Sequence, residues 1–313
     1  MKQNNILENT VNFPEESYKR HANWYNSQFP DIEKKRQVLL NFKNYKGTIH
    51  HWLQNLFFEN LQPLLGSKNK KWVTVGDAYG HDANYLLDNE ISEVIATDLN
   101  TDFLELSKEI GLIDKFEVQN AEKLSYDDSS IDYILCKESY HHFPRPYAAL
   151  YDMLRVCREA VIIIEPQDPI LRMPYLLGLS NIINRIDPSL LSKIWKNKIS
   201  YEQVGNFVYK VSEREFEKAA AGFQLPIYAI KEINPNFWFP ESNQFIAKNT
   251  EPQFRKLKRK KWFRDLLSKT GILPYQTICI ILFKKIPREE ILIDLKKYGY
   301  RIVNIKKNPY RNI

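Results

Sequence analysis

Hydrophobic residues change their periodicity near residue 71. Residues 1–70 carry aromatic and aliphatic positions at helical spacing with no strand-like alternation, and we interpret them as an N-terminal helical cap. From residue 71 onward, short β-branched runs alternate with helical stretches, which is typical of βαβ units. The pattern therefore predicts an α/β protein with a mostly parallel sheet.

Seven runs are predicted to be strands. They are 72–75, 94–97, 116–118, 133–136, 160–164, 226–230 and 277–283. Helices are predicted at 82–89, 101–110, 146–158, 213–221 and 251–268. The helix at 213–221 has Ser212 as its N-cap candidate and Glu215 three residues further on, which together predict a capping box.

Changes in this pattern divide the chain into four parts. The cap (1–70) is followed by a core with the first five strands (71–166). Prolines then interrupt an apolar but irregular insertion (167–212), and the last part (213–313) supplies the remaining strands and a basic helix.

Composition and charge restrict the function classes. Cys136, Cys157 and Cys279 lie far apart with no metal-ligand spacing, so neither a disulfide scaffold nor a metal site is indicated. A secretory signal and a membrane-spanning run are both absent, which favours the cytoplasm. The net charge of +7 includes a dense basic run at 255–264, which could contact an anionic membrane or a polyanion, or could simply be a solvated helix face.

A glycine-containing turn joins the first predicted strand to the first helix of the core. Gly76 and Gly80 flank Asp77, Ala78 and Tyr79. A strand that passes through small residues directly into a helix lets a ligand approach the backbone at the carboxyl end of the strand. Such turns are common, so this one alone is weak support for a nucleotide site.

Two further motifs follow in order. Asp98 ends the second strand 18 residues after Gly80, where a carboxylate can accept hydrogen bonds from both ribose hydroxyls; it could equally cap the next helix. The third motif begins at Asn120 and Ala121 and runs to Tyr133.

The three motifs together resemble those of class I S-adenosylmethionine-dependent methyltransferases of the type 11-like group. The glycine motif of that family is acidic-x-Gly-x-Gly-x-Gly, and here Thr74 replaces the acid and Ala78 the central glycine. The resemblance implies a Rossmann-like, seven-stranded sheet and S-adenosylmethionine as cofactor, with S-adenosylhomocysteine as product and no metal.

The resemblance also implies which residues contact the cofactor. In the family, the side chain at the position of Asn120 and the next backbone N–H read the adenine edge, and the fourth strand ends beside the sulfonium. Asp77 or Asp82 is a candidate partner for the methionine ammonium group. The predicted cofactor site consists of Gly76, Asp77, Ala78, Tyr79, Gly80, Asp98, Leu99, Asn120, Ala121, Glu122 and Lys137.

Two adjacent histidines, His141 and His142, follow the fourth strand. They resemble the arrangement in sugar O-methyltransferases, in which one histidine removes the proton from the acceptor hydroxyl. His142 is the first candidate for the base, and Glu165 at the end of the fifth strand could hold the imidazole in its tautomer. The alternatives are that the histidines pack beneath the cofactor and that Glu165 only ends its strand.

Acceptor-binding candidates lie in three segments. Tyr140, Arg145 and the stretch His50-His51-Trp52 could form an acceptor wall, although each could equally be core or surface. In this family the insertion after the fifth strand often forms a substrate lid. Its polar residues in this chain are Asn206, Tyr209 and Lys210, which would suit a polyhydroxylated or anionic acceptor.

The run from Lys137 to Asp168 resembles bacterial methyltransferases of surface-glycan biosynthesis, which implies a sugar or glycan acceptor. Methylation of another small metabolite at N, C or O remains an alternative, as does a non-catalytic cofactor-binding protein. The positive charge suggests RNA binding or RNA methylation as a further alternative, but the chain has no recognised RNA module and no Asn-Pro-Pro-Tyr motif. The oligomeric state is not indicated.

Overall fold

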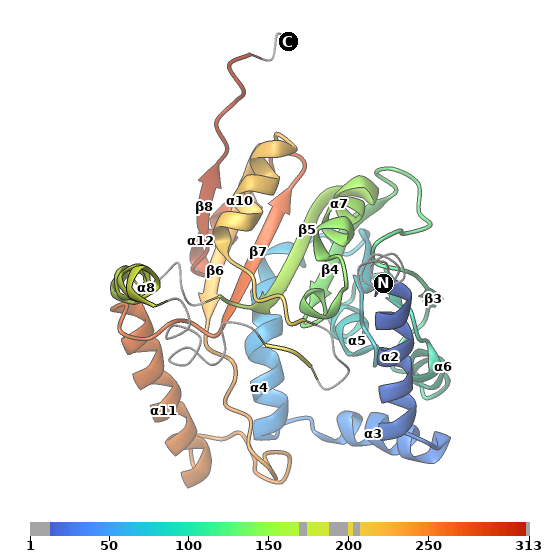
Figure 1. Ribbon diagram of the computed structural model, residues 1–313. Coiled ribbons are helices and arrows are strands. Elements are labelled where there is room, and N and C mark those ends of the chain that lie inside the picture. The colour runs from blue at the N-terminus through green and yellow to red at the C-terminus, as the bar shows by residue number, and fades with distance from the viewer. Residues whose placement is uncertain (1–12, 169–173, 188–199, 203–206, 311–313) are drawn as a thin grey trace, which may run out of the picture.

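The computed structural model describes residues 13–168, 174–187, 200–202 and 207–310. In this part of the chain the strands form one sheet in the order β3-β2-β1-β4-β5-β7-β6-β8 (Figure 1). They are β1 (Lys71–Val75), β2 (Glu93–Asp98), β3 (Phe116–Val118), β4 (Ile131–Lys137), β5 (Cys157–Pro166), β6 (Ile227–Ile233), β7 (Thr277–Phe283) and β8 (Arg301–Asn304). The pairs among β1 to β5 are parallel, and those involving β6, β7 and β8 are antiparallel.

The predicted Rossmann-like, mostly parallel sheet is confirmed, with one correction. The sheet has eight strands in the described residues, not seven, because β8 pairs with β6 as an outer strand. Of its four residues, Arg301 and Asn304 are exposed and polar and only Ile302 and Val303 are apolar, so the strand lacks the longer apolar run that predicts one.

The helices and 3-10 turns connect and cover these strands. The N-terminal set is α2 (Phe13–Gln28), α3 (Ile32–Asn44), α4 (Ile49–Phe58) and η1 (Glu59–Leu64). The core and insertion contain α5 (His81–Asp88), α6 (Asp102–Glu109), η2 (Tyr140–His142), α7 (Pro146–Val156) and α8 (Pro174–Ile186). The last part contains α10 (Glu213–Gly222), α11 (Pro252–Lys269) and α12 (Glu289–Lys297).

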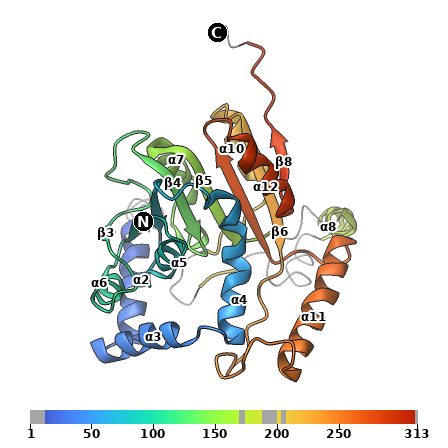
Figure 2. The same ribbon diagram turned by 180° about the vertical axis from the view of Figure 1, so that it is seen from behind.

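Helices lie on both faces of the sheet, which explains why the strands are almost continuously apolar. Alternate strand residues point to opposite faces, so Trp72 packs with one group of helices and Val73 with the other. The first group consists of α3 to α6 and α12, and the second of α7 and α10 (Figures 1 and 2).

Two helix predictions can be compared in detail. The capping box is confirmed, since the backbone N–H of Ser212 donates to Glu215 Oε2 at 2.6 Å at the start of α10. The predicted helix at 146–158 is too long, because Cys157 is already extended (φ −74°, ψ 145°) and begins β5. The chain thus passes from α7 into β5 without a loop.

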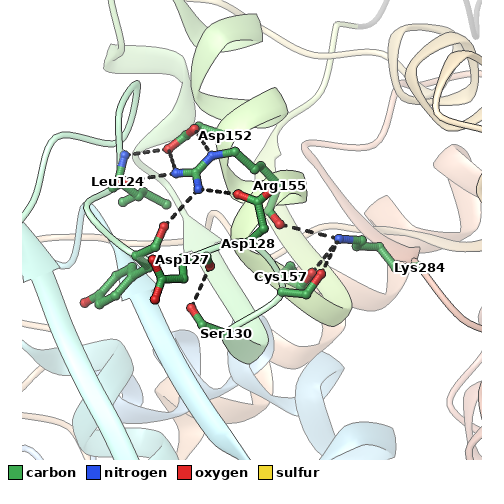
Figure 3. A network of polar contacts seen from close by, with 10 residues as sticks. Leu124, Asp127, Asp128, Ser130, Asp152, Arg155, Cys157 and Lys284 are labelled. Atoms are coloured by element: carbon green, nitrogen blue, oxygen red, sulfur yellow. Dashed lines mark hydrogen bonds and ion pairs between the residues drawn. The ribbon is translucent and has the colours of Figure 1, made fainter.

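Arg155 near the end of α7 fixes the long loop between β3 and β4 (Figure 3). Its guanidinium donates to the backbone oxygens of Leu124 and Tyr126 at 2.9 Å each, and to Asp128 and Asp152. Five N–H donors in a rigid fork suit this role. The anchored loop is the one that carries Asn120 to Glu122.

The carboxyl ends of β4 and β5 point downward in Figure 1, toward the side of the molecule where α3 and the lower part of α4 lie. None of the helices in the described ranges combines the length and apolar character needed to cross a bilayer.

Candidate active site

A cavity of about 830 Å³ lies at the carboxyl ends of the strands. Its floor is formed by the residues that end β1, β2 and β4, and its walls by the loop after β3 and by α2 and α4. Pro235, Asn236 and Trp238, after β6, complete the lining. The volume is within the range of small-molecule sites, roughly 300–1,000 Å³.

The glycine turn has the backbone conformation that only glycine adopts easily. Gly76 and Gly80 have φ values of +72° and +73°, and Gly80 is the N-cap of α5. Ala78 is not among the described non-glycine residues with positive φ, so alanine is tolerated where the family motif has its central glycine. Gly76, Asp77, Ala78 and Tyr79 line the cavity; Gly80 lies behind them.

Replacement of Gly76 by alanine is expected to destabilise the protein. The new Cβ would lie 2.6 Å from Ser139 Cβ, and Ser139 cannot move freely because its hydroxyl donates to Val75 O at 3.0 Å. Gly76→Ala should cost about 1–3 kcal/mol in urea denaturation through overpacking and backbone strain. Gly66→Ala is the matched control, since no atom lies within 4 Å of its Cβ position. Equal stability of the two variants would contradict the packing argument.

Asp77 organises the turn in place of the usual acid. Its carboxylate accepts from the backbone N–H of Asp82 at 3.2 Å and of Ala83 at 2.9 Å, and from the Thr74 hydroxyl at 3.0 Å. Burial raises the pKa of Asp77, and these donors oppose the rise. Thr74, at the usual acidic position, therefore donates a hydrogen bond to Asp77. Asp77 in turn accepts from the first-turn N–H groups of α5 and caps this helix.

Lys137 at the end of β4 is a buried cation. Its Nζ lies 3.1 Å from Asp82 Oδ1 and 5.2 Å from the centre of the Phe58 ring. Burial raises the pKa of Asp82 to about 7, although Lys137 opposes the rise. Asp77 and Asp82 both line the cavity, but their contacts within the protein leave them less available to a ligand ammonium group than the sequence implied.

Glu138 follows Lys137 and was not singled out by the sequence. It has a strained φ of +54°, lines the cavity, and its buried Oε1 has no hydrogen-bond partner in the described residues. Burial raises the pKa of Glu138 to about 7, and the Glu165 charge adds to the rise. A strained, unpartnered carboxyl beside a cavity is typical of a ligand-binding position.

The Asp98 and Asn120 motifs converge on the same cavity. Asp98, Leu99, Asn120, Ala121 and Glu122 all line it. Asp98 Oδ1 accepts from Asn100 N–H at 2.9 Å, whereas Asn120 Oδ1 accepts from Glu122 N–H at 2.9 Å and from the Tyr18 hydroxyl at 3.4 Å.

The two histidines after β4 have different environments. His141 is buried, and its Nδ1 lies 2.5 Å from Glu165 Oε2. Burial lowers its pKa, but the hydrogen bond and charge of Glu165 outweigh burial and raise the pKa of His141 overall. His142 lines the cavity, and its Nδ1 contacts Glu202 Oε1.

Glu165 holds the turn that presents His142. It is fully buried, and its Oε1 accepts from the backbone N–H groups of Ser139 at 2.8 Å and Tyr140 at 2.7 Å. Glu165 therefore orients His141, not His142, and neither Glu165 nor His141 lines the cavity in the described residues. His141, predicted as a possible base, and Glu165, predicted to orient the base, are therefore positioning residues for the turn that carries His142.

Two residues predicted to form an acceptor wall, Tyr140 and Arg145, do not line the cavity. Tyr140 is only 3% exposed and packs on Phe143 and Phe216 in the core. Arg145 points outward and pairs with Glu122 at 2.6 Å.

The insertion and the aromatic stretch give mixed outcomes. Tyr209 packs on Phe207, and neither it nor Lys210 belongs to the described lining, while Asn206 lies outside the described residues. Of the stretch His50-His51-Trp52, only His50 reaches the cavity.

Helix α2 supplies a wall that the sequence did not assign. Tyr18, His21 and Tyr25 lie on one face of α2 and line the cavity. Their spacing of three and four residues is the available signal, because it places them on one side of a helix. The sequence predicts that these three residues share one face of a helix, but it does not show that this face lines the cavity.

Comparison with known families identifies one part of the chain. Residues 73–164 match a family model described as a methyltransferase domain. The chain therefore contains a methyltransferase domain. No curated protein matches the chain in sequence.

Solved structures similar to this methyltransferase include three from microorganisms. One is a chain of the complex between the Haloferax volcanii Trm112 methyltransferase activator and a putative methyltransferase (13% identity, 76% of this chain and 94% of that chain, TM-score 0.47). The others are YcgJ from Bacillus subtilis (19%, 74% and 100%, 0.45) and an S-adenosylmethionine-dependent methyltransferase from Archaeoglobus fulgidus (16%, 79% and 99%, 0.46).

The methyltransferase cavity fits S-adenosylmethionine. At Gly76 the backbone is open to the cavity, and Asp98 offers a carboxylate at the end of β2 for ribose hydroxyls. Asn120 and Ala121, the residues predicted to read adenine, line the same cavity, although Asn120 Oδ1 already accepts two hydrogen bonds.

Cofactor affinity is expected to depend on Asp98 and on pH. Burial raises the pKa of Asp98 to about 6, and only the ionised carboxylate accepts from both ribose hydroxyls. The affinity for S-adenosylhomocysteine should therefore fall as the pH is lowered through about 6. Asp98→Asn should weaken binding by about 10- to 100-fold, since hydrogen bonds to a charge are worth roughly 1.5–3 kcal/mol. Calorimetry between acidic and neutral pH checks both effects, and an unchanged pH dependence in the variant would contradict the assignment.

Proposed function

We propose that this methyltransferase methylates a hydroxyl group of a sugar, a nucleotide sugar or a growing glycan, with His142 as the general base. The observation that carries the proposal is the separation of the two histidines. His142 reaches the cavity that would hold the cofactor, whereas His141 is buried against Glu165.

The chemistry requires a proton acceptor beside the acceptor hydroxyl. When bound, S-adenosylmethionine supplies an electrophilic methyl group on a sulfonium. A sugar hydroxyl is a weak nucleophile, and a positioned neutral imidazole removes its proton while the oxygen attacks the methyl carbon. The carbon–sulfur bond breaks as the carbon–oxygen bond forms, and the proton passes to His142.

The remaining lining suits a polar acceptor. His21, Glu138 and Asn236 offer hydrogen-bonding groups, and Trp238 offers an aromatic face at the same cavity. Small-molecule sites combine aromatic walls with a few polar groups that fix orientation. Glu165 holds the turn from which His142 reaches the cavity, and a fixed imidazole would help to align the acceptor hydroxyl.

An acceptor screen tests this proposal. The protein is incubated with S-adenosylmethionine and, separately, with monosaccharides, nucleotide sugars, small amines and transfer RNA, and both S-adenosylhomocysteine release and the methylated product are measured. We expect methylation of a hydroxyl in the sugar panel. Turnover confined to amines would favour methylation of another small metabolite, and turnover confined to RNA would favour the nucleic-acid alternative; either overturns the sugar proposal.

A further inference from the structure

Three potential metal ligands meet at one end of the cavity. They are His21 from α2, His142 from η2 and Glu202 from the insertion. One ligand atom from each lies within 4.8 Å of the others. The two imidazoles line the cavity, so the cluster opens onto the space that would hold the cofactor and acceptor.

The cluster has an unsatisfied polar atom. Glu202 Oε2 is buried and has no hydrogen-bond partner among the described residues. The other carboxylate oxygen, Oε1, contacts His142 Nδ1, and the rings of His21 and His142 are 5.7 Å apart. Buried polar groups without partners are rare and call for an unseen partner such as an ion or water.

We propose that His21, His142 and Glu202 bind a divalent transition-metal ion such as Zn²⁺ or Co²⁺. Imidazole nitrogen and carboxylate oxygen are ligands that these ions accept, and three protein ligands leave a position open toward the cavity. Mg²⁺ prefers a shell of oxygen ligands, so it fits this set poorly. No sequence pattern predicts this site, because its ligands are far apart in the chain and no two have metal-ligand spacing.

Metal binding and proton acceptance would both use the imidazole of His142, so they exclude one another. An imidazole that binds a metal through one nitrogen keeps its proton on the other, so it cannot accept a proton from a hydroxyl. This consequence rests on the proposed base role of His142, whereas metal binding itself does not. The metal-bound protein should therefore bind S-adenosylhomocysteine but turn over slowly.

Direct binding tests the site without an acceptor. The full-length protein is stripped with a chelator and titrated with Zn²⁺ by calorimetry and with Co²⁺ by visible absorption. We expect one ion per chain, and His21→Ala should weaken binding by more than about tenfold, because one of three ligands is lost. His51→Ala is the matched control, since His51 lies on α4 outside the cluster and outside the lining.

Folding and function are separated in the same experiment. His21→Ala must retain the circular dichroism spectrum and the urea midpoint of the wild type, and Glu202→Gln, which keeps the side-chain shape, should weaken metal binding as well. Absence of Zn²⁺ and Co²⁺ binding, or equal binding by the His21 and His51 variants, would overturn the metal site. Metal binding without inhibition of the turnover found in the acceptor screen would instead overturn the base role of His142.

A second surface is carried by an independent observation on α11. Phe254 and Leu257 face the protein and are buried, whereas Trp262, Phe263 and Leu266 are 66%, 57% and 43% exposed. At 100° per residue the exposed three share the outward face with Arg255, Lys256 and Arg259. These three cations form no ion pair with any residue in the described ranges.

We propose that this outward face of α11 docks on an anionic lipid bilayer. Large exposed apolar side chains among unpaired cations match a surface that offers negative headgroups above an apolar layer. Tryptophan is particularly suited to that boundary, because its ring is apolar and its N–H is polar.

Vesicle binding tests this surface. The wild-type protein should co-sediment with vesicles of phosphatidylglycerol and phosphatidylcholine at low salt, and not with phosphatidylcholine alone. The double variant Trp262→Ala/Phe263→Ala should lose most binding, while Ile286→Ala, which removes an apolar side chain 75% exposed elsewhere, should not. Absence of binding to the anionic vesicles, or the same Trp262-dependent binding to single-stranded RNA without vesicle binding, would overturn the lipid assignment.

Discussion

His142→Ala is expected to lower the turnover number by about 10²- to 10⁴-fold, the usual contribution of a general base. His142 is the histidine of the pair that lines the cavity, and no backbone group depends on its side chain in the described hydrogen bonds. The affinity for S-adenosylhomocysteine should stay unchanged, since Asp98, assigned to ribose, ends β2 and Asn120, assigned to adenine, lies in the loop after β3. Steady-state kinetics with an acceptor from the screen, together with calorimetry, measures both quantities.

The matched control for this result is His51→Ala. His51 is also partly buried, but it lies on α4 and is not among the residues that line the cavity. We expect it to keep wild-type turnover. If His142→Ala retains turnover within about tenfold of the wild type, methyl transfer proceeds by alignment alone and needs no base.

The sheet was predictable from the sequence because its strands are buried on both faces. Runs such as Thr277–Phe283, with every residue buried, differ sharply from the amphipathic helices between them. Arg301–Asn304 was missed because this outer strand has only two apolar residues, between exposed polar ends, and so has no such run. The end of α7 was misjudged because Cys157 enters β5 directly, and no glycine or proline marks the boundary.

The convergence of Gly76, Asp98 and Lys137 on one cavity was predictable, since strand order alone brings them to one edge. Their contacts with the cofactor stay a prediction. The positions of the acceptor candidates were not predictable. Tyr140 was a candidate because it is an aromatic residue just after β4. Its ring packs on Phe216 in the core, and the turn that Glu165 holds by hydrogen bonds directs His142 to the cavity instead. His21 and Glu138 depend on helix placement and on a local positive φ, neither of which a residue pattern reveals.

Glu165→Ala is expected to produce the largest loss of stability, about 3–5 kcal/mol in urea denaturation, because it removes one partner of a buried hydrogen-bonded pair. The carboxylate is fully buried and serves three donors, the N–H groups of Ser139 and Tyr140 and the His141 ring. Its loss leaves all three without an acceptor. Glu159→Ala is the matched control, since Glu159 lies on the same strand but is 27% exposed. It pairs with Lys70 and accepts from the Tyr133 hydroxyl, so a smaller loss of about 1–2 kcal/mol is expected.

The pH dependence of this loss distinguishes the ion pair from simple packing. The pKa of His141 is raised above its ordinary value of 6.5 in the folded protein, because Glu165 outweighs the effect of burial. The pair therefore stabilises the fold fully below pH 6.5, and this contribution disappears as the pH rises through the raised pKa. The difference in unfolding free energy between the wild type and Glu165→Gln, which keeps the shape, should shrink with rising pH. A difference independent of pH would mean that Glu165 acts through its hydrogen bonds to the backbone and not through the charge of His141.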